Sequence, residues 1–155
     1  MKKILLLISF LRSSPKAIEE ALQLAKKHGA ELVVFFVIDV EYADKIAHRL
    51  ADEGWIGGKP SEQFYMSLLR EYKLQAEAKV REVERRAAEL GVTVRSVIKS
   101  GSILPETLRQ ADLEDPDLII VTRRKRSSLS RLIFGSVVKA LKRQARCEVR
   151  VIDEE

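Results

Sequence analysis

Residues 4–39 have the sequence ILLLISFLRSSPKAIEEALQLAKKHGAELVVFFVID. The stretch contains two apolar runs, at 4–8 and 32–38, and neither alternates with polar residues. Such runs are typical of strands that are covered on both faces. Between them, Ser14 is placed to cap a helix and Gly29 to end it. The stretch therefore predicts strand, helix, strand, which is the unit of a parallel sheet.

The rest of the chain continues the alternation of strands and helices. A long amphipathic pattern predicts a helix over 61–90, and the glycine-rich, polar stretch 41–60 is expected to be a flexible loop. Five strands joined by helices need crossover connections. We therefore expect an α/β, doubly wound domain over 1–155, with a mainly parallel sheet and helices on both faces. The remaining expected elements are strands at 92–99, 118–121 and 148–152 and helices at 105–113 and 135–146.

Length and composition agree with one compact domain. The chain has 155 residues, of which 46% are hydrophobic and 33% are charged, so disordered and fibrous classes are excluded. The first apolar run is too short for a membrane span, and no small-residue cleavage site follows it. The single cysteine, Cys147, rules out an internal disulfide and suits a reducing compartment. We expect a cytoplasmic protein.

The positive charge is unevenly distributed. The formal net charge is +5, yet nine Lys and Arg residues and no Asp or Glu lie between residues 118 and 147. A basic block of this kind attracts phosphate-bearing ligands, nucleic acid or acidic partners. Near the end of a helix, however, Lys142, Arg143 and Arg146 are explained by the helix dipole alone.

Candidate ligand-binding residues follow the expected strands. In open parallel sheets, ligands bind beyond the carboxyl ends of the strands, where the strand order reverses. Ser9, Phe10 and Arg12 follow the first strand, Asp39 ends the second, and residues 122–126 follow the fourth. A helix start adds free amides that favour an anion, most naturally a phosphate, and its residues are Gly135, Ser136 and Val137.

Over nearly its full length the chain resembles the universal stress protein family. The segment at 37–39, Val37-Ile38-Asp39, is similar to the family's second-strand ending, and 117–121 is similar to its Asp-Leu-Ile-Val strand. Ile133-Phe134-Gly135-Ser136-Val137 resembles the Leu-Gly-Ser-Val helix start. Residues 147–152 resemble the last strand, Cys-Pro-Val-Leu-Val-Val. The resemblance implies a strand order of 3-2-1-4-5 and a homodimer formed through the last strand, with Val149 and Val151 at the interface. In one branch of the family it also implies ATP bound at the strand ends.

The chain departs from the ATP-binding branch. The pattern there is Gly-x-x-Gly, nine residues, then Gly-Ser or Gly-Thr. Aligning it on Gly135-Ser136 places Thr122 and Lys125 where the two glycines belong. A β-branched residue adopts positive φ only with strain. Ser9 stands where the family has Asp, and Phe10 stands where it has Gly and could fill part of the cleft.

Three interpretations of this site remain open. In the first, no ATP binds and the protein is a non-catalytic, dimeric stress-response or regulatory protein that acts on an unidentified partner. In the second, the cationic side chains at 123–126 replace the lost backbone contacts and hold a nucleotide or other phosphate-bearing molecule, as part of a switch with weak or no ATP hydrolysis. In the third, the basic block binds nucleic acid, although it lacks interleaved aromatic residues and a recognition helix. Candidate residues for a nucleotide or anion are Ser9, Val37, Thr122, Arg123, Lys125, Gly135, Ser136 and Val137.

Nothing in the sequence favours catalysis. His28 and His48 have no spacing typical of a metal site or a nucleophile-base pair. Asp39 and Glu41 could form an acid-base pair, but carboxylates at a strand end more often face solvent or cap a turn. Cys147 precedes a buried strand and is expected to be inert. We expect no enzyme activity and no metal.

Overall fold

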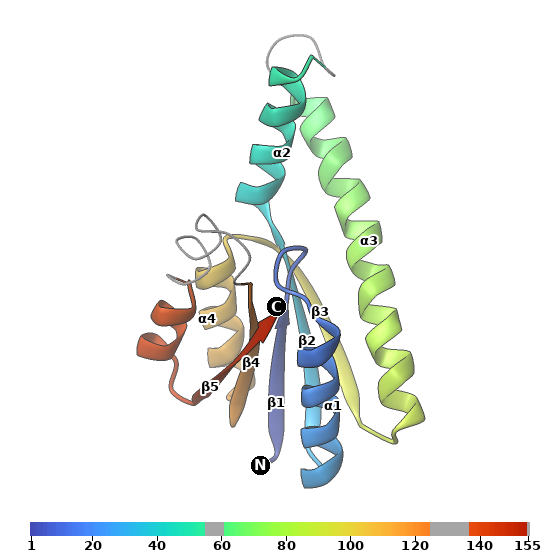
Figure 1. Ribbon diagram of the computed structural model, residues 1–155, viewed down its shortest axis with the longest axis vertical. Coiled ribbons are helices and arrows are strands. Elements are labelled where there is room, and N and C mark those ends of the chain that lie inside the picture. Colours follow the sequence, from blue (N-terminus) through green and yellow to red (C-terminus); the bar gives the residue numbers. More distant parts are fainter. Residues whose placement is uncertain (55–60, 125–136, 155) are drawn as a thin grey trace.

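The computed structural model describes residues 1–54, 61–124 and 137–154. Its five strands form one sheet in the order β3-β2-β1-β4-β5, and every neighbouring pair is parallel (Figure 1). The expected α/β fold and strand order are confirmed. The strands are β1 (Lys3–Ile8), β2 (Glu31–Asp39), β3 (Val94–Gly101), β4 (Leu118–Arg124) and β5 (Glu148–Glu154).

Helices cover both faces of the sheet. Side chains of α1 and α3 pack into one hydrophobic cluster, and those of α4 and of a helical segment at 137–144 pack into the other. Along β1, Leu6 faces the first cluster and Leu7 the second, so the strand is buried on both sides, as its unbroken apolar run predicted. The helices with defined bounds are α1 (Pro15–His28), α2 (Val40–Asp52), α3 (Glu62–Glu89) and α4 (Ile103–Glu114).

The expected boundaries of α1 are confirmed. Ser14 Oγ accepts a hydrogen bond from Ala17 N at 3.1 Å, and Pro15 occupies the first turn. Gly29 ends the helix in the left-handed conformation, with φ of 61°. These caps fix where the chain leaves β1 and where it enters β2.

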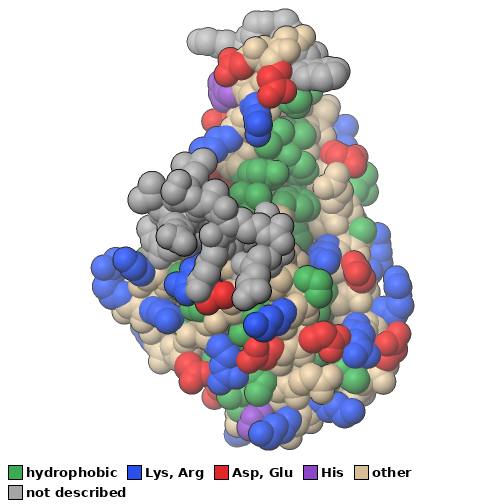
Figure 2. Space-filling model, in the orientation of Figure 1, with side chains coloured by type: hydrophobic (Ala, Val, Ile, Leu, Met, Phe, Trp, Pro, Cys, Tyr) green, Lys and Arg blue, Asp and Glu red, His purple; other side chains and the backbone are tan. Residues whose placement is uncertain are grey.

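The expectation of a loop over 41–60 is wrong for its first half, because α2 occupies Val40–Asp52. Asp39 caps this helix, and Ala43 and Ala47, one turn apart, are buried against α3. Residues 55–60 lie outside the described part. In Figure 1, α2 and the first half of α3 project beyond the carboxyl edge of the sheet, and Figure 2 shows hydrophobic side chains gathered between them.

An ion-pair network joins the strands at the opposite, amino edge of the sheet. Arg95 Nη1 on β3 donates to Glu114 Oε2 at the end of α4 at 2.7 Å, and Arg95 Nη2 donates to Glu31 on β2 at 3.1 Å. Gln110 also donates to Glu114 at 2.9 Å. The Glu114 side chain is only 8% exposed, and its hydrogen bonds to Arg95 lower its pKa to about 2.

Glu114→Gln is expected to destabilise the fold by about 2 kcal/mol at neutral pH, because it removes a carboxylate that the folded state holds ionised. A lowered pKa stabilises the fold above the ordinary glutamate value, and this contribution is lost as the pH falls from about 5 towards 2. Urea unfolding at pH 7 and pH 3 should therefore show the difference from the parent shrinking in acid. Glu53→Gln is the control, since Glu53 pairs on the surface with Arg49. An equal loss from both variants would contradict a special role for Glu114.

Candidate functional site at the carboxyl edge of the sheet

The strand order reverses at β1, which has β2 on one side and β4 on the other. The chain leaves β1 through a tight turn in which the backbones of Ser9 and Arg12 exchange two hydrogen bonds, of 3.2 and 3.1 Å. Ser9 is buried. The sequence-predicted ligand region therefore lies at the switch point of the sheet, where clefts of doubly wound folds form.

Arg12 places a positive charge inside this region. Its side chain is nearly buried, with 2% of the residue exposed, and desolvation lowers its pKa to about 10 while the nearby charge of Asp39 opposes that shift. The guanidinium therefore stays protonated at neutral pH. Sequence reasoning placed Arg12 after the first strand but gave no sign of its burial, because burial depends on which distant segments of the chain pack over the turn.

Asp39 and Glu41 have different tasks. An Asp39 carboxylate oxygen accepts hydrogen bonds from the backbones of Glu41 and Tyr42, at 3.0 and 3.4 Å, and so caps α2. Glu41 is exposed and accepts a hydrogen bond from Ser102 at 3.2 Å. Of the two residues considered as an acid-base pair, Asp39 therefore caps α2, and Glu41 joins the start of α2 to the start of α4.

Phe10 lies within an aromatic cluster. Its ring centroid is 5.0 Å from those of Phe36 on β2 and Tyr72 on α3, and Tyr72 stacks on Tyr42 of α2 at 6.0 Å. Tyr65 adds a hydrogen bond of 3.1 Å from its hydroxyl to the carbonyl of Val40. Edge-to-face and offset contacts of this kind add to the area that the rings bury. The cluster ties the turn after β1 to the projecting helices.

Thr122 is part of a strand. It pairs with Ile152 of β5, β4 continues to Arg124, and Asp115 is the only described residue other than glycine with positive φ. Thr122 is 1% exposed, and its Oγ1 lies 3.4 Å from Ser14 Oγ at the start of α1. The first of the two family glycine positions is therefore occupied by paired strand backbone and a buried side chain.

Arg123 is bound to the neighbouring strand. Its Nε and Nη2 donate to the two carboxylate oxygens of Asp153 on β5, at 2.8 and 3.2 Å, and this pairing raises the pKa of Arg123. An anionic ligand would have to compete with Asp153 for the guanidinium.

Two further candidate residues lie at one hydrophobic cluster, away from Ser9 and Thr122. Val37 is fully buried in the cluster beneath α4, and Val137 is half-buried beside the same cluster. Lys125, Gly135 and Ser136 lie outside the described residues, so the expected anion site cannot be assembled from the described part of the chain. Val149 and Val151 are half-buried on β5, an outermost strand of the sheet.

Both histidines are exposed, and the cysteine is partly buried. His48 is exposed and lies 3.5 Å from Asp44 on α2. Burial raises the pKa of the Cys147 thiol, which disfavours the reactive thiolate. Among residues 1–54, 61–124 and 137–154, no group of three or more His, Cys, Asp or Glu side chains is arranged to hold a metal ion. In the same residues, no helix combines the length and the apolar character needed to cross a membrane.

Comparison with known proteins agrees with the strand order and the placement of the switch point. A family model, that of the Universal stress protein family, matches residues 1–153. The chain belongs to this family. The universal stress protein YxiE of Bacillus subtilis is 27% identical over 150 residues, which cover 97% of each chain.

Solved universal stress protein structures share the fold. UspA from Lactobacillus plantarum superposes with a TM-score of 0.72 at 21% identity and covers 97% of both chains. A universal stress protein family protein from Arabidopsis thaliana with AMP bound superposes with a TM-score of 0.64 at 14% identity, covering all of this chain and 93% of the other. At these identities the likeness to the universal stress protein structures concerns the fold.

Proposed function

We propose that this universal stress protein is a non-catalytic, dimeric stress-response or regulatory protein that does not hold ATP in the family's glycine loop. The observation that carries the proposal is the course of β4 through Thr122. A glycine there would let the backbone turn away and approach a phosphate, whereas Thr122 keeps the chain paired to β5 and fills the space below α1.

Two further contacts support the proposal. Phe10 packs between Phe36 and Tyr72 and so occupies space beside the switch point. Arg123, which directly follows the first of the two missing glycine positions, is bound by Asp153. Binding of a triphosphate by the backbone at Thr122 and binding by the Arg123 side chain are therefore both disfavoured.

Equilibrium binding of a fluorescent ATP analogue, with and without Mg²⁺, tests the proposal. We expect no saturable binding up to millimolar ligand. Tight, magnesium-dependent binding would overturn it. Arg123→Ala distinguishes binding through the guanidinium from binding through the backbone, because only a ligand held by the guanidinium loses affinity in that variant.

The dimer is proposed through β5. This strand pairs with β4 on one side, and its other side is the edge of the described sheet. An open strand edge is a template for pairing with a second chain. Val149 and Val151 contribute partly exposed apolar side chains to this strand.

Val149→Lys with Val151→Lys is expected to convert a dimer at micromolar concentration into a monomer, because lysines on an edge strand oppose strand pairing. Light scattering measures the mass, and Leu113→Lys, on an exposed α4 position, is the control. A parent chain that is already monomeric would refute the proposed dimer, and a double variant that stays dimeric would refute the β5 interface.

The alternative function is a nucleotide- or phosphate-binding switch. It is favoured by the AMP bound to the Arabidopsis relative and by the buried charge of Arg12 at the switch point. Saturable binding of AMP that is lost in Arg12→Gln, with helical circular dichroism unchanged, would support this alternative over the main proposal.

A further inference from the structure

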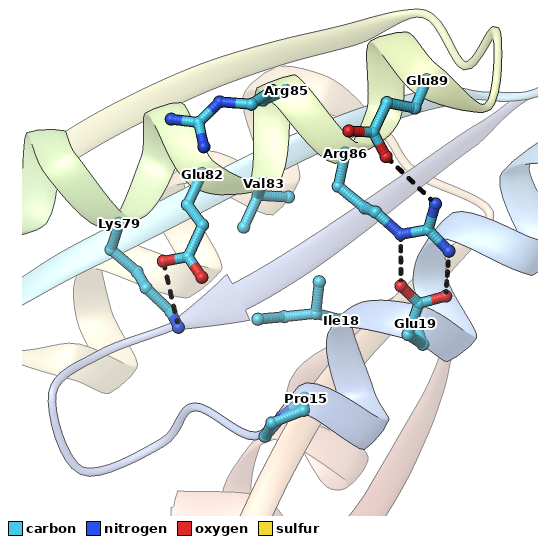
Figure 3. Close-up of a pocket in the computed structure, with 9 residues that line it drawn as sticks. All are labelled: Pro15, Ile18, Glu19, Lys79, Glu82, Val83, Arg85, Arg86 and Glu89. Carbon is cyan, nitrogen blue, oxygen red and sulfur yellow. Dashed lines mark hydrogen bonds and ion pairs between the residues drawn. The ribbon is translucent and has the colours of Figure 1, made fainter.

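Two hollows lie on the face of the sheet that α1 and α3 cover, one between these helices and the other between α3 and the turn after β1. The first, of about 300 Å³, runs along the helices and includes Ile18 and Val83 (Figure 3). The second, of about 330 Å³, lies beside the turn after β1, and Lys79 lines both. We name the second the Phe10 hollow. Its lining residues are Ser9, Phe10, Ser13, Phe36, Gln75 and Lys79.

Ion pairs between α1 and α3 and within α3 line the first hollow. Arg86 donates to both carboxylate oxygens of Glu19, at 2.7 and 3.3 Å, and also lies 3.4 Å from Glu89 (Figure 3). Glu82 adds a further carboxylate to its lining. These ion pairs hold α3 against α1. The lining carries as many carboxylates as cations, because Lys79 and Arg85 also line the hollow, so it offers no net positive charge to an anion.

The Phe10 hollow has the opposite character. The rings of Phe10 and Phe36 meet edge to face at 5.0 Å, while hydroxyls, the Gln75 amide and one ammonium group supply the polar lining. None of its six lining residues carries a carboxylate. An apolar surface with a few convergent polar groups is the usual make-up of a small-ligand site.

Lys79 supplies the charge that selects a ligand. Its closest carboxylate contact is with Glu82 at 3.8 Å, and both side chains are partly exposed, at 33% and 66%. A surface pair this long and this exposed is weak. Gln75 lies one turn earlier on α3, and its Nε2 donates to Glu71 at 3.3 Å. A ligand anion can therefore displace Glu82 from Lys79 at small cost.

We propose that the Phe10 hollow binds a small aromatic anion, a carboxylate or sulfonate of one or two rings, with the rings against Phe10 and the charge at Lys79. The volume of the hollow suits such a molecule, because it lies at the low end of the range for ligand pockets, about 300–1,000 Å³. The site needs no residue of the missing glycine loop. It shares Ser9 with the candidate nucleotide residues, so its test is made in the absence of nucleotide.

The test uses the fluorescent anion 1-anilinonaphthalene-8-sulfonate and its uncharged analogue N-phenyl-1-naphthylamine. Lys79→Gln should weaken binding of the anion roughly fivefold to tenfold and leave the uncharged analogue unaffected. Glu82→Gln should strengthen anion binding about twofold to threefold, because it frees the ammonium group. Lys73→Gln, an exposed position on the same helix, is the matched control. Circular dichroism of each variant checks the fold.

Amide chemical-shift changes locate the probe. We expect the anion to shift the signals of Ser13 and Gln75 and to saturate at one molecule per chain. The proposal is overturned if Lys73→Gln weakens binding as much as Lys79→Gln, if the uncharged probe loses affinity equally, or if the shifts fall elsewhere. Absence of saturable binding to the parent chain overturns it as well.

Discussion

The variant Thr122→Gly with Lys125→Gly is expected to gain ATP binding, from none detectable at millimolar ligand to a dissociation constant of roughly tens of micromolar. The gain follows from the course of β4. Thr122 is buried against Ser14 and holds the backbone in paired strand geometry, and glycine removes both restraints. Fluorescence anisotropy of a labelled ATP analogue measures the affinity.

The matched control is Thr122→Ala with Lys125→Gly. Alanine removes the same buried hydroxyl and methyl groups but keeps the Cβ atom that disfavours positive φ. We expect this control not to bind, and its thermal unfolding should resemble that of the glycine variant to within about 1 kcal/mol. Equal ATP binding by both variants would show that packing volume, and not backbone freedom, closes the site.

Phe36→Ala is expected to destabilise the fold by about 3–5 kcal/mol, since it empties a fully buried aromatic position. For a domain of this size that corresponds to a fall in Tm of roughly 6–20 °C. Phe10→Ala should cost less, about 1–2 kcal/mol, because Phe10 is only partly buried. Urea unfolding with linear extrapolation gives both values.

The double variant Phe10→Ala with Phe36→Ala tests whether the aromatic cluster acts as a unit. The two rings are in contact, so the loss of unfolding free energy in the double variant should be smaller than the sum of the two single losses by about 0.5–1.5 kcal/mol. Strict additivity would mean that Phe10 is not held by Phe36 in solution, and it would remove one of the contacts that support the proposed absence of ATP.

The sequence predicted best those elements whose signals are local. Apolar runs defined β1 and β2, and the caps at Ser14 and Gly29 defined α1, because each depends on neighbouring residues alone. The helix α2 was missed because its local signal favours a loop. Its buried positions are only Ala43 and Ala47, and the glycines that follow favoured a loop.

The site was harder to predict because its contacts join distant segments. The fourth strand was expected to end at Val121, since polar residues follow, yet pairing with β5 extends it to Arg124. The ion pair between Arg123 and Asp153 and the burial of Arg12 have no local signal either. The departure from the glycine pattern at Thr122, by contrast, was visible in the sequence, because the residue type at that single position is enough to reveal it.

A crystal structure of the protein grown with millimolar MgATP tests the central proposal most directly. The proposal predicts that β4 stays paired with β5 through Thr122 and that no triphosphate lies against that residue. Electron density for a triphosphate in contact with the backbone at Thr122 and Lys125, with both side chains in ordinary geometry, would contradict it.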